Sequence, residues 1–180
     1  MSDAFNVKVG PGKLYIAELG TDEPVDLTTV WDAEWIAAGW TDEGHTFTQS
    51  PSVDPIEVAE LKSPVKYYTG SIEYSLEFAL AEITARNLQI ALNGGTITTG
   101  TGIKTFQPPA GNAEAVRIMI GWESDSADER WVFRKCFQSG DSAIARQKGP
   151  AKATIPMTFN LEIPSGVTLP WKGIIKDLPA

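Results

Sequence analysis

The stretch Lys66-Tyr-Tyr-Thr-Gly-Ser-Ile-Glu-Tyr-Ser-Leu-Glu-Phe-Ala-Leu80 alternates between apolar and polar residues with a period of two. One set holds the large apolar residues Tyr68, Ile72, Tyr74, Leu76, Phe78 and Leu80, with Gly70 among them. The other set is small, polar or acidic: Thr69, Ser71, Glu73, Ser75 and Glu77. This period predicts a β-strand that is buried on one face. At about 3.3 Å per residue it would reach roughly 50 Å, so we expect it to bend between two sheets or to belong to a large barrel.

The same alternation returns near the C-terminus, from Ala153 to Ile163. Its apolar set is Ala153, Ile155, Met157, Phe159, Leu161 and Ile163. Its polar set contains Thr154, Thr158, Asn160 and Glu162. Pro156 lies among the polar positions and has no N–H to donate, so an edge or a bulge is expected there.

Shorter strands are predicted around these two. They are Lys13–Leu19, Trp35–Thr41, His45–Gln49, Ala115–Trp122, Arg130–Phe137 and Ala143–Gln147. Asp42-Glu43-Gly44 is interpreted as a turn between two of them. In the fourth, the apolar residues Val116, Ile118, Ile120 and Trp122 share a face. One-sided burial of this kind favours antiparallel pairing, because parallel strands are usually apolar on both faces.

One helix is predicted, at about residues 82–93. Thr84 can cap its start, and Ala85, Leu88 and Ala91 recur at helical spacing. Asn93-Gly94 supplies a left-handed stop. A brief helical turn around Leu27–Trp31 is a weaker candidate. The fold class is therefore mainly β, an antiparallel β-sandwich or barrel with one flanking α-helix, long loops and a C-terminal arm.

Three segments show no period: Gln49–Pro64, Gly94–Glu114 and Pro164–Ala180. The first two are interpreted as a long excursion and a flexible loop. The last carries four large apolar residues, Trp171, Ile174, Ile175 and Leu178. Such an arm either docks on a neighbouring subunit or folds back on its own, and the sequence leaves both open. We divide the chain into an N-terminal arm (1–12), a β-sandwich domain (13–163) and a C-terminal arm (164–180).

Composition excludes several classes of protein. The 180 residues are 42% hydrophobic, which is too apolar for a disordered chain, and no apolar stretch is long enough for a helical membrane span. No signal peptide is expected from the first residues. A formal charge of −8 argues against tight binding of nucleic acid, which needs clustered Lys and Arg. The single cysteine, Cys136, has no partner for an internal disulfide and fits a reducing compartment.

Catalytic and metal sites are also disfavoured. His45 and Cys136 are the only residues of their types and lack zinc-site spacing. His45 follows the predicted turn Asp42-Glu43-Gly44 and is interpreted as a polar turn residue. A catalytic role is disfavoured, since no G-x-S-x-G motif accompanies it. The Gly94–Lys104 stretch has Thr101 and Gly102 where a P-loop requires Lys and Ser or Thr. We expect neither an enzyme nor a cofactor.

The order of the pieces resembles a known family. Lys13-Leu-Tyr-Ile-Ala-Glu-Leu-Gly20 and Pro24-Val-Asp-Leu-Thr-Thr29 are followed by Trp35-Ile-Ala-Ala-Gly-Trp-Thr-Asp-Glu-Gly44 with Phe47. The proline-rich excursion, the long strand and the helical Asn87-Leu-Gln-Ile-Ala-Leu-Asn-Gly-Gly95 come next. Over about residues 13–163 this resembles the major tail tube proteins of long non-contractile-tailed bacteriophages, whose fold the type VI secretion tube protein shares.

The resemblance implies a structural virion protein that forms hexameric rings. In that family each subunit adds strands to a continuous barrel, and stacked rings enclose the channel through which DNA is ejected. It also implies self-association, tail terminator, tape measure and tail tip proteins as partners, double-stranded DNA only in transit, no membrane, and assembly of the virion tail in the host cytoplasm.

Parity then predicts the channel lining, because only one face of each long strand can meet the core. The expected lumen-facing residues are Thr69, Ser71, Glu73, Ser75, Glu77, Thr154, Thr158, Asn160 and Glu162. A solvated exterior is the alternative for this face. An acidic lining suits a DNA conduit, since carboxylates repel phosphates.

A β-sandwich carbohydrate-binding module is the alternative function. Six tryptophans and four tyrosines could supply sugar-stacking platforms. However, Trp31, Trp35, Trp40, Trp122 and Trp131 lie in or beside predicted strands. Most of them are therefore expected in the core.

Overall fold

The structure, a computed structural model, describes residue 8 and residues 10–146, 148 and 151–177. It is mostly β, with one short helix. The elements in chain order are β1 (Gly12–Glu18), β2 (Ile36–Ala37), β3 (Thr41–Ile56), β4 (Lys66–Leu80), α1 (Ala85–Ala91), β5 (Thr96–Gly100), β6 (Ile103–Gln107), β7 (Arg117–Ser124), β8 (Glu129–Gln138), β9 (Ile155–Leu161) and β10 (Trp171–Ile175).

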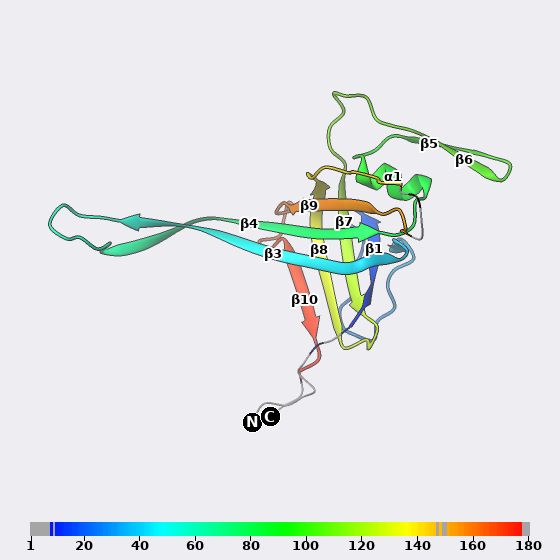
Figure 1. Cartoon of the computed structure of the whole chain (residues 1–180). Coiled ribbons are helices and arrows are strands. Elements are labelled where there is room, and N and C mark those ends of the chain that lie inside the picture. The colour runs from blue at the N-terminus through cyan, green and yellow to red at the C-terminus, as the bar shows by residue number, and fades with distance from the viewer. Residues whose placement is uncertain (1–7, 9, 147, 149–150, 178–180) are drawn as a thin grey trace.

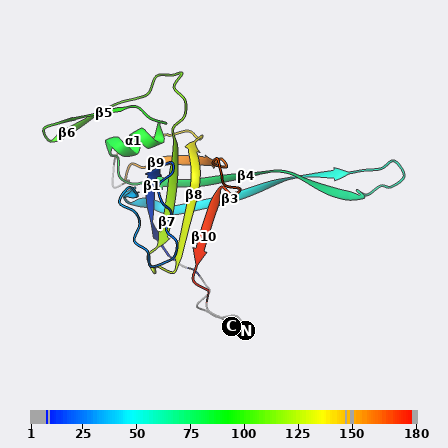
Figure 2. The same cartoon turned by 180° about the vertical axis from the view of Figure 1, so that it is seen from behind.

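Eight of the strands form one antiparallel sheet that folds over on itself. Its order is β2-β1-β7-β8-β9-β4-β3, and β10 also pairs with β8. In Figure 1, β9, β4 and β3 run across β1, β7, β8 and β10, so the sheet makes two crossed layers; Figure 2 shows them from behind. Strand β8 joins the layers, because β10 pairs with its residues 129–133 and β9 with its residues 136–138. The predicted mainly-β, antiparallel fold with one helix is confirmed.

The core lies between the two layers. Its buried side chains come from both: Leu14, Ile16, Leu76, Phe78, Leu80, Ile120, Phe133, Cys136, Ile155, Met157 and Phe159. From the two alternating stretches they include Leu76, Phe78, Leu80, Ile155, Met157 and Phe159. The prediction that the whole apolar set is buried is wrong for Tyr68, Ile72 and Ile163, which are exposed because they lie beyond the crossing layer. In the register of the two strands, Leu76, Phe78 and Leu80 of β4 lie opposite Phe159, Met157 and Ile155 of β9. Their side chains therefore meet in the core. Phe78 and Phe159 stack with ring centroids 5.5 Å apart.

Strand β4 has the predicted bounds, but its partner β3 is much longer than expected. The prediction that Gln49–Pro64 has no regular structure is wrong for residues 49–56, because β3 continues to Ile56 and pairs with β4 as far as Lys66. Residues 57–64 lie in the loop that connects the two strands. Strand β3 is the outer strand of the sheet, so it has a neighbouring strand on one side only. An edge strand tolerates Pro51 and Pro55 because a proline, which has no N–H, can face the unpaired side without the loss of a hydrogen bond.

The start of β3 also differs from expectation. Asp42-Glu43-Gly44 is not a turn between strands but part of β3, where the register to β4 shifts between Thr41 and His45. Gly44 has φ of 84°, a conformation that glycine adopts without strain at such a bulge. The strand predicted over Trp35–Thr41 is reduced to β2, a two-residue pairing with β1.

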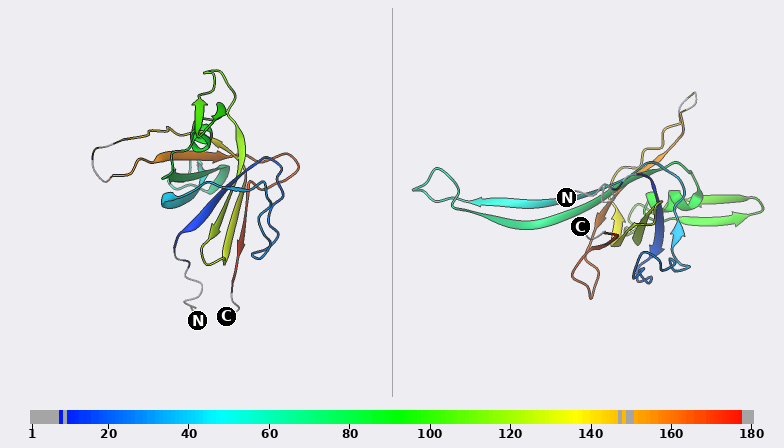
Figure 3. Two further views of the ribbon diagram at one scale, coloured as in Figure 1. Left: turned by 90° about the vertical axis from the view of Figure 1, so that its right-hand side faces the viewer. Right: turned by 90° about the horizontal axis from the view of Figure 1, so that it is seen from below.

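The predicted Gly94–Glu114 loop contains a second hairpin. Strands β5 and β6 pair with each other through a two-residue turn, Thr101-Gly102, and Gly102 takes φ of 73°. Figure 3 shows this hairpin projecting beside α1. Before it, α1 is shorter than predicted but capped as expected: the Thr84 hydroxyl accepts from the Asn87 N–H, and Asn93 takes the left-handed φ of 57° that ends the helix.

Three smaller predictions fail or are qualified. The described part of Ala143–Gln147, residues 143–146, has no regular structure, and Gln147 lies outside the described residues. Leu27–Trp31 forms bends and no helical turn, since the Asp26 side chain accepts hydrogen bonds from the backbone and hydroxyls of Thr28 and Thr29. Pro156 lies in the part of β9 that pairs only with β4, so the expected edge is local.

Candidate interaction surfaces

The polar residues of β4 and β9 meet on the face that points away from the core. Glu77 lies opposite Thr158, and Ser75 lies opposite Asn160, so these four side chains form one patch. Glu77 and Asn160 are exposed, and Ser75 and Thr158 are half-buried. These four residues therefore lie on the side of the sheet away from the core, as the alternation predicted.

Strand β3 extends the same face with residues that the sequence analysis did not assign. Thr46 lies opposite Glu77, Thr48 opposite Ser75 and Ser50 opposite Glu73, and all three β3 residues are exposed. The alternation of Thr46 and Thr48 around Phe47 could have indicated them, since Phe47 packs against the core. We call this surface the polar face: Thr46, Thr48, Ser50, Glu73, Ser75, Glu77, Thr158 and Asn160.

The other predicted lumen residues lie elsewhere. Thr69 and Ser71 are exposed on the part of β4 that runs beyond the core. Thr154 precedes β9 and is half-buried. Glu162 follows β9 and pairs with Lys135 (2.7 Å) and Arg117 (3.3 Å), which hold the pKa of its carboxyl below the ordinary value.

The second surface is the part of the β3–β4 hairpin that projects from the domain, residues 50–73, which we call the β-arm (Figure 1). Apart from the half-buried Pro64, every residue of it is exposed. Its paired stretch of about eight residues would extend roughly 25 Å. It carries eight exposed large apolar side chains: Val53, Ile56, Val58, Leu61, Val65, Tyr67, Tyr68 and Ile72. So many apolar groups in water are typical of an interaction surface.

The third surface is a groove of about 780 Å³ between α1 and the ends of β1, β2 and β7. Apolar side chains line much of it, including the exposed Leu19, Ile36 and Val116. Arg86 of α1 and the carboxylates Glu18 and Glu34 also line it. The helix α1, which forms one wall of the groove, lies on the side of the domain from which the β5–β6 hairpin projects, and the β-arm projects in the other direction (Figure 3).

The predicted C-terminal arm is partly a strand of the subunit's own sheet. In β10, Trp171 pairs with Phe133 and Ile174 with Arg130. The Trp171 ring stacks on Trp131 with centroids 5.0 Å apart and meets Phe47 edge-on at 5.3 Å. Of the four apolar arm residues, Ile175 is 50% exposed and Leu178 lies outside the described residues. The alternative in which the arm folds back on its own subunit therefore describes residues 171–175.

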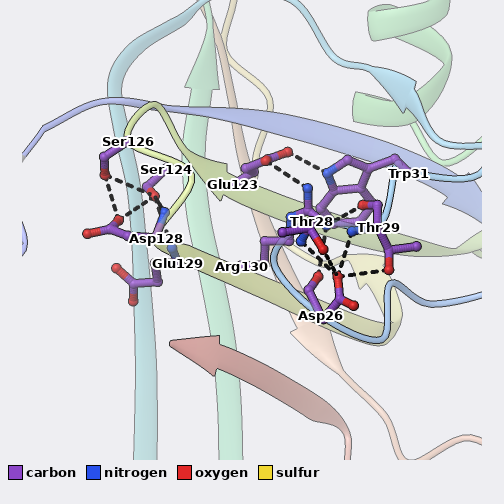
Figure 4. A network of polar contacts seen from close by, with 10 residues as sticks. All are labelled: Asp26, Thr28, Thr29, Trp31, Glu123, Ser124, Ser126, Asp128, Glu129 and Arg130. Carbon is purple, nitrogen blue, oxygen red and sulfur yellow. Dashed lines mark hydrogen bonds and ion pairs between the residues drawn. The ribbon is translucent and has the colours of Figure 1, made fainter. Parts of the chain in front are cut away.

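A buried polar network fixes the 20–35 segment against the sheet (Figure 4). Arg130, only 5% exposed, pairs with Glu123 at 2.9 Å and donates to the carbonyls of Asp26 and Thr29. Glu123 also accepts from the Trp31 indole N–H at 2.6 Å. The Thr29 N–H, above all, holds the pKa of Asp26 below its usual range. These contacts are internal to the subunit, so the network serves to position the 20–35 segment.

A smaller network holds the β7–β8 turn (Figure 4). The Asp128 carboxylate accepts from the hydroxyls of Ser124 and Ser126, and Lys8 pairs with it at 2.9 Å. The hydrogen bond from Ser126 is the main cause that lowers the pKa of Asp128. In the described part of the chain, no three His, Cys, Asp or Glu side chains are grouped to hold a metal ion.

The interpretation of His45 as a turn residue is wrong, because His45 lies within β3 opposite Phe78. It is half-buried, and its ring lies 4.9 Å from that of Trp122. Burial lowers its pKa from the ordinary 6.5. The unfolded chain then binds more protons than the folded one as pH falls through 6.5, so stability should decrease below that pH. We expect urea midpoints to fall between about pH 7.5 and 5.5, before carboxylates titrate. In a His45→Gln variant the urea midpoint should no longer fall over this pH range. An unchanged fall would show that His45 is not its cause.

The tryptophans are mostly packed. Trp31, Trp35, Trp122, Trp131 and Trp171 contact the two clusters of the core, and Trp40 is the one that is largely exposed, at 77%. A platform of paired exposed indoles, which sugar stacking would favour, is not formed by the tryptophans, all six of which are described. No helix in the described residues is long and apolar enough to cross a membrane.

Comparison with known proteins identifies the family of the chain. A family model described as phage tail tube protein matches residues 2–180. A comparison with curated proteins finds no match. The match covers all of residues 13–163, over which the order of the pieces resembles the tail tube proteins. The chain therefore belongs to the phage tail tube protein family, whose members are structural proteins of the virion tail.

Proposed function

We propose that this protein assembles into hexameric rings, and that the rings stack into a tube through which DNA is ejected. The β-arm is the observation that carries the proposal. Eight large apolar side chains stand in water on a two-stranded arm that has no layer on either face. A hairpin alone is marginally stable in water, so a neighbouring subunit is the natural cover.

The polar face is the proposed channel lining. It is small, hydroxyl-rich and acidic. Behind Ser75, Glu77, Thr158 and Asn160 the alternate residues pack in the core, so this side must meet solvent or a channel. Ser50 and Glu73 continue the same face onto the first residues of the β-arm. Glu73 and Glu77 would recur once per subunit and repel phosphate. Thr69, Ser71, Thr154 and Glu162 would extend the lining, although Lys135 and Arg117 offset the negative charge of Glu162 there.

Closing the sheet across subunits would also remove exposed edges. Strand β3 is the last strand of the sheet order, and β10 pairs with β8 alone. Unpaired edges invite uncontrolled association unless they are paired or covered. Ile175 and Leu178, at the end of the chain, are the remaining candidates for an inter-subunit arm.

The proposal extends to partners and place. Tail terminator, tape measure and tail tip proteins would bound the tube, and assembly would take place in the host cytoplasm. The role is structural and without catalysis or cofactor. Carbohydrate binding remains the alternative function, since Trp40, Tyr67 and Tyr68 are exposed. The other five tryptophans pack against the core, which favours the structural role.

Electron microscopy of the purified protein tests this function. We expect hexameric rings or tubes with a central channel at high protein concentration, since weak contacts repeated around a ring favour assembly by mass action. A variant with Val58→Ser and Leu61→Ser on the β-arm should remain folded but assemble poorly. A protein that stays monomeric at every concentration and binds a glycan column would support the alternative function instead.

A further inference from the structure

We propose that the tip of the β-arm, residues 57–62, docks in the α1 groove of a second copy of this chain. The inference rests on the proposed self-assembly and goes beyond it by naming the two surfaces that meet. The tip has the sequence Glu57-Val-Ala-Glu-Leu-Lys62, which places Val58 and Leu61 between charged residues. Both apolar side chains are exposed.

The groove matches the tip in apolar character. Leu19, Ile36, Ile90, Val116 and Ile118 line it from β1, β2, α1 and the start of β7, and Leu19, Ile36 and Val116 are exposed in the free subunit. A volume of about 780 Å³ is ample for two aliphatic side chains with their backbone. Seating Val58 and Leu61 there would remove exposed apolar surface from both partners.

Charge points to the same pairing. Arg86 lines the groove and is half-buried, and burial lowers the pKa of its guanidinium. Within the described residues no carboxylate lies in ion-pair distance of it, and its two hydrogen bonds, to the Ala37 and Ile16 carbonyls, are long at 3.4 and 3.5 Å. A half-buried cation with weak neutral partners favours an incoming carboxylate.

The tip supplies that carboxylate. Glu57 and Glu60 flank Val58, and neither forms an ion pair within the described part of the subunit. Lys62 at the end of the tip can face Glu18 or Glu34 on the groove wall. Tip and groove thus carry complementary signs at more than one position.

Placement in the fold makes the contact one between two different surfaces of the same protein. The β-arm projects from one side of the domain, and α1, which forms one wall of the groove, lies on the other (Figure 3). Each copy would therefore use its arm on one neighbour and its groove on the next. Such head-to-tail contacts generate closed rings or open filaments, which are the assemblies a tube needs.

Disulfide trapping between two variants tests the contact. One variant carries Leu61→Cys at the tip and the other Ile36→Cys in the groove. The native Cys136 is buried in the core and should not react. After assembly of an equal mixture and mild oxidation, we expect a band at twice the 19.5 kDa subunit mass. Each variant assembled alone should give little of it.

A matched control uses Ile103→Cys, which is exposed on the β5–β6 hairpin, in place of Ile36→Cys. It should yield at least about tenfold less dimer, because only the groove cysteine would lie near the tip. Equal trapping with Ile103→Cys, or tubes that form without any cross-link, would overturn the docking while leaving self-assembly standing. Failure of the unmodified protein to assemble would instead overturn the proposed function.

Charge exchange gives an independent readout. Arg86→Glu should reduce the assembled fraction by about tenfold, since it places like charges together at a desolvated contact. Adding Glu57→Lys and Glu60→Lys to the same chain should restore assembly. Lys104→Glu, on the β5–β6 hairpin, is the control and should leave assembly unchanged. Loss of assembly that the tip reversal does not rescue would count against the pairing.

Discussion

Replacing Trp171 with alanine should lower the free energy of unfolding of the free subunit by about 2–4 kcal/mol. The indole stacks on Trp131 at 5.0 Å and meets Phe47 at 5.3 Å, and it packs on the main core cluster. Its loss would leave a cavity that uncovers both rings. Urea unfolding followed by far-ultraviolet circular dichroism measures the change without depending on tryptophan fluorescence.

Ile175→Ala is the matched control within the same strand. Ile175 is 50% exposed and outside the core clusters, so its truncation should cost less than about 1 kcal/mol. Equal stability of Trp171→Ala and the unchanged protein would show that Trp171 matters only between subunits. By the same argument, removing residues 164–180 should destabilise the domain as well as affect assembly, because it deletes β10.

The sequence predicted best those elements whose signal is local. The bounds of β4 were predicted correctly, and its burial was predicted for the part near the core, where Leu76, Phe78 and Leu80 share one face. Tyr68 and Ile72 continue the alternation but are exposed. The helix caps at Thr84 and Asn93 depend on side chains and backbone angles within a few residues. Parity along each strand then placed Glu77 and Thr158 on the outward face without knowledge of their pairing.

The sequence failed where structure depends on distant partners. Beyond Gln49, β3 has no buried face, so nothing imposes alternation, and its prolines suggested a loop. Its strand conformation comes from hydrogen bonds to β4 across the hairpin. For β10 the decisive fact is the pairing of Trp171 with Phe133, far away in the chain. The groove could not be foreseen either, because it joins the ends of four elements.

Changing Glu73 and Glu77 together to lysine should leave ring assembly intact and strongly slow DNA ejection. Both side chains are exposed on the polar face, four positions apart on β4. In a hexamer they would form rings of carboxylate in water, where salt screens charges over about 8 Å. Replacing the two carboxylates should therefore change ring assembly little.

The lysine variant would instead line the channel with cations, which bind phosphates and release counterions. Phage carrying it should form tails of normal appearance while infectivity falls by about a hundredfold or more, with DNA retained in the particle. The Glu73→Gln and Glu77→Gln double variant is the control, since it removes the negative charge without adding positive charge and should eject DNA nearly normally. Salt provides a second check: raising it should partly relieve the lysine block, because phosphate binding weakens steeply with ionic strength. The lining assignment is wrong if the lysine variant ejects DNA at the normal rate, or if a structure of the assembled tube places Glu73 and Glu77 on its outer surface.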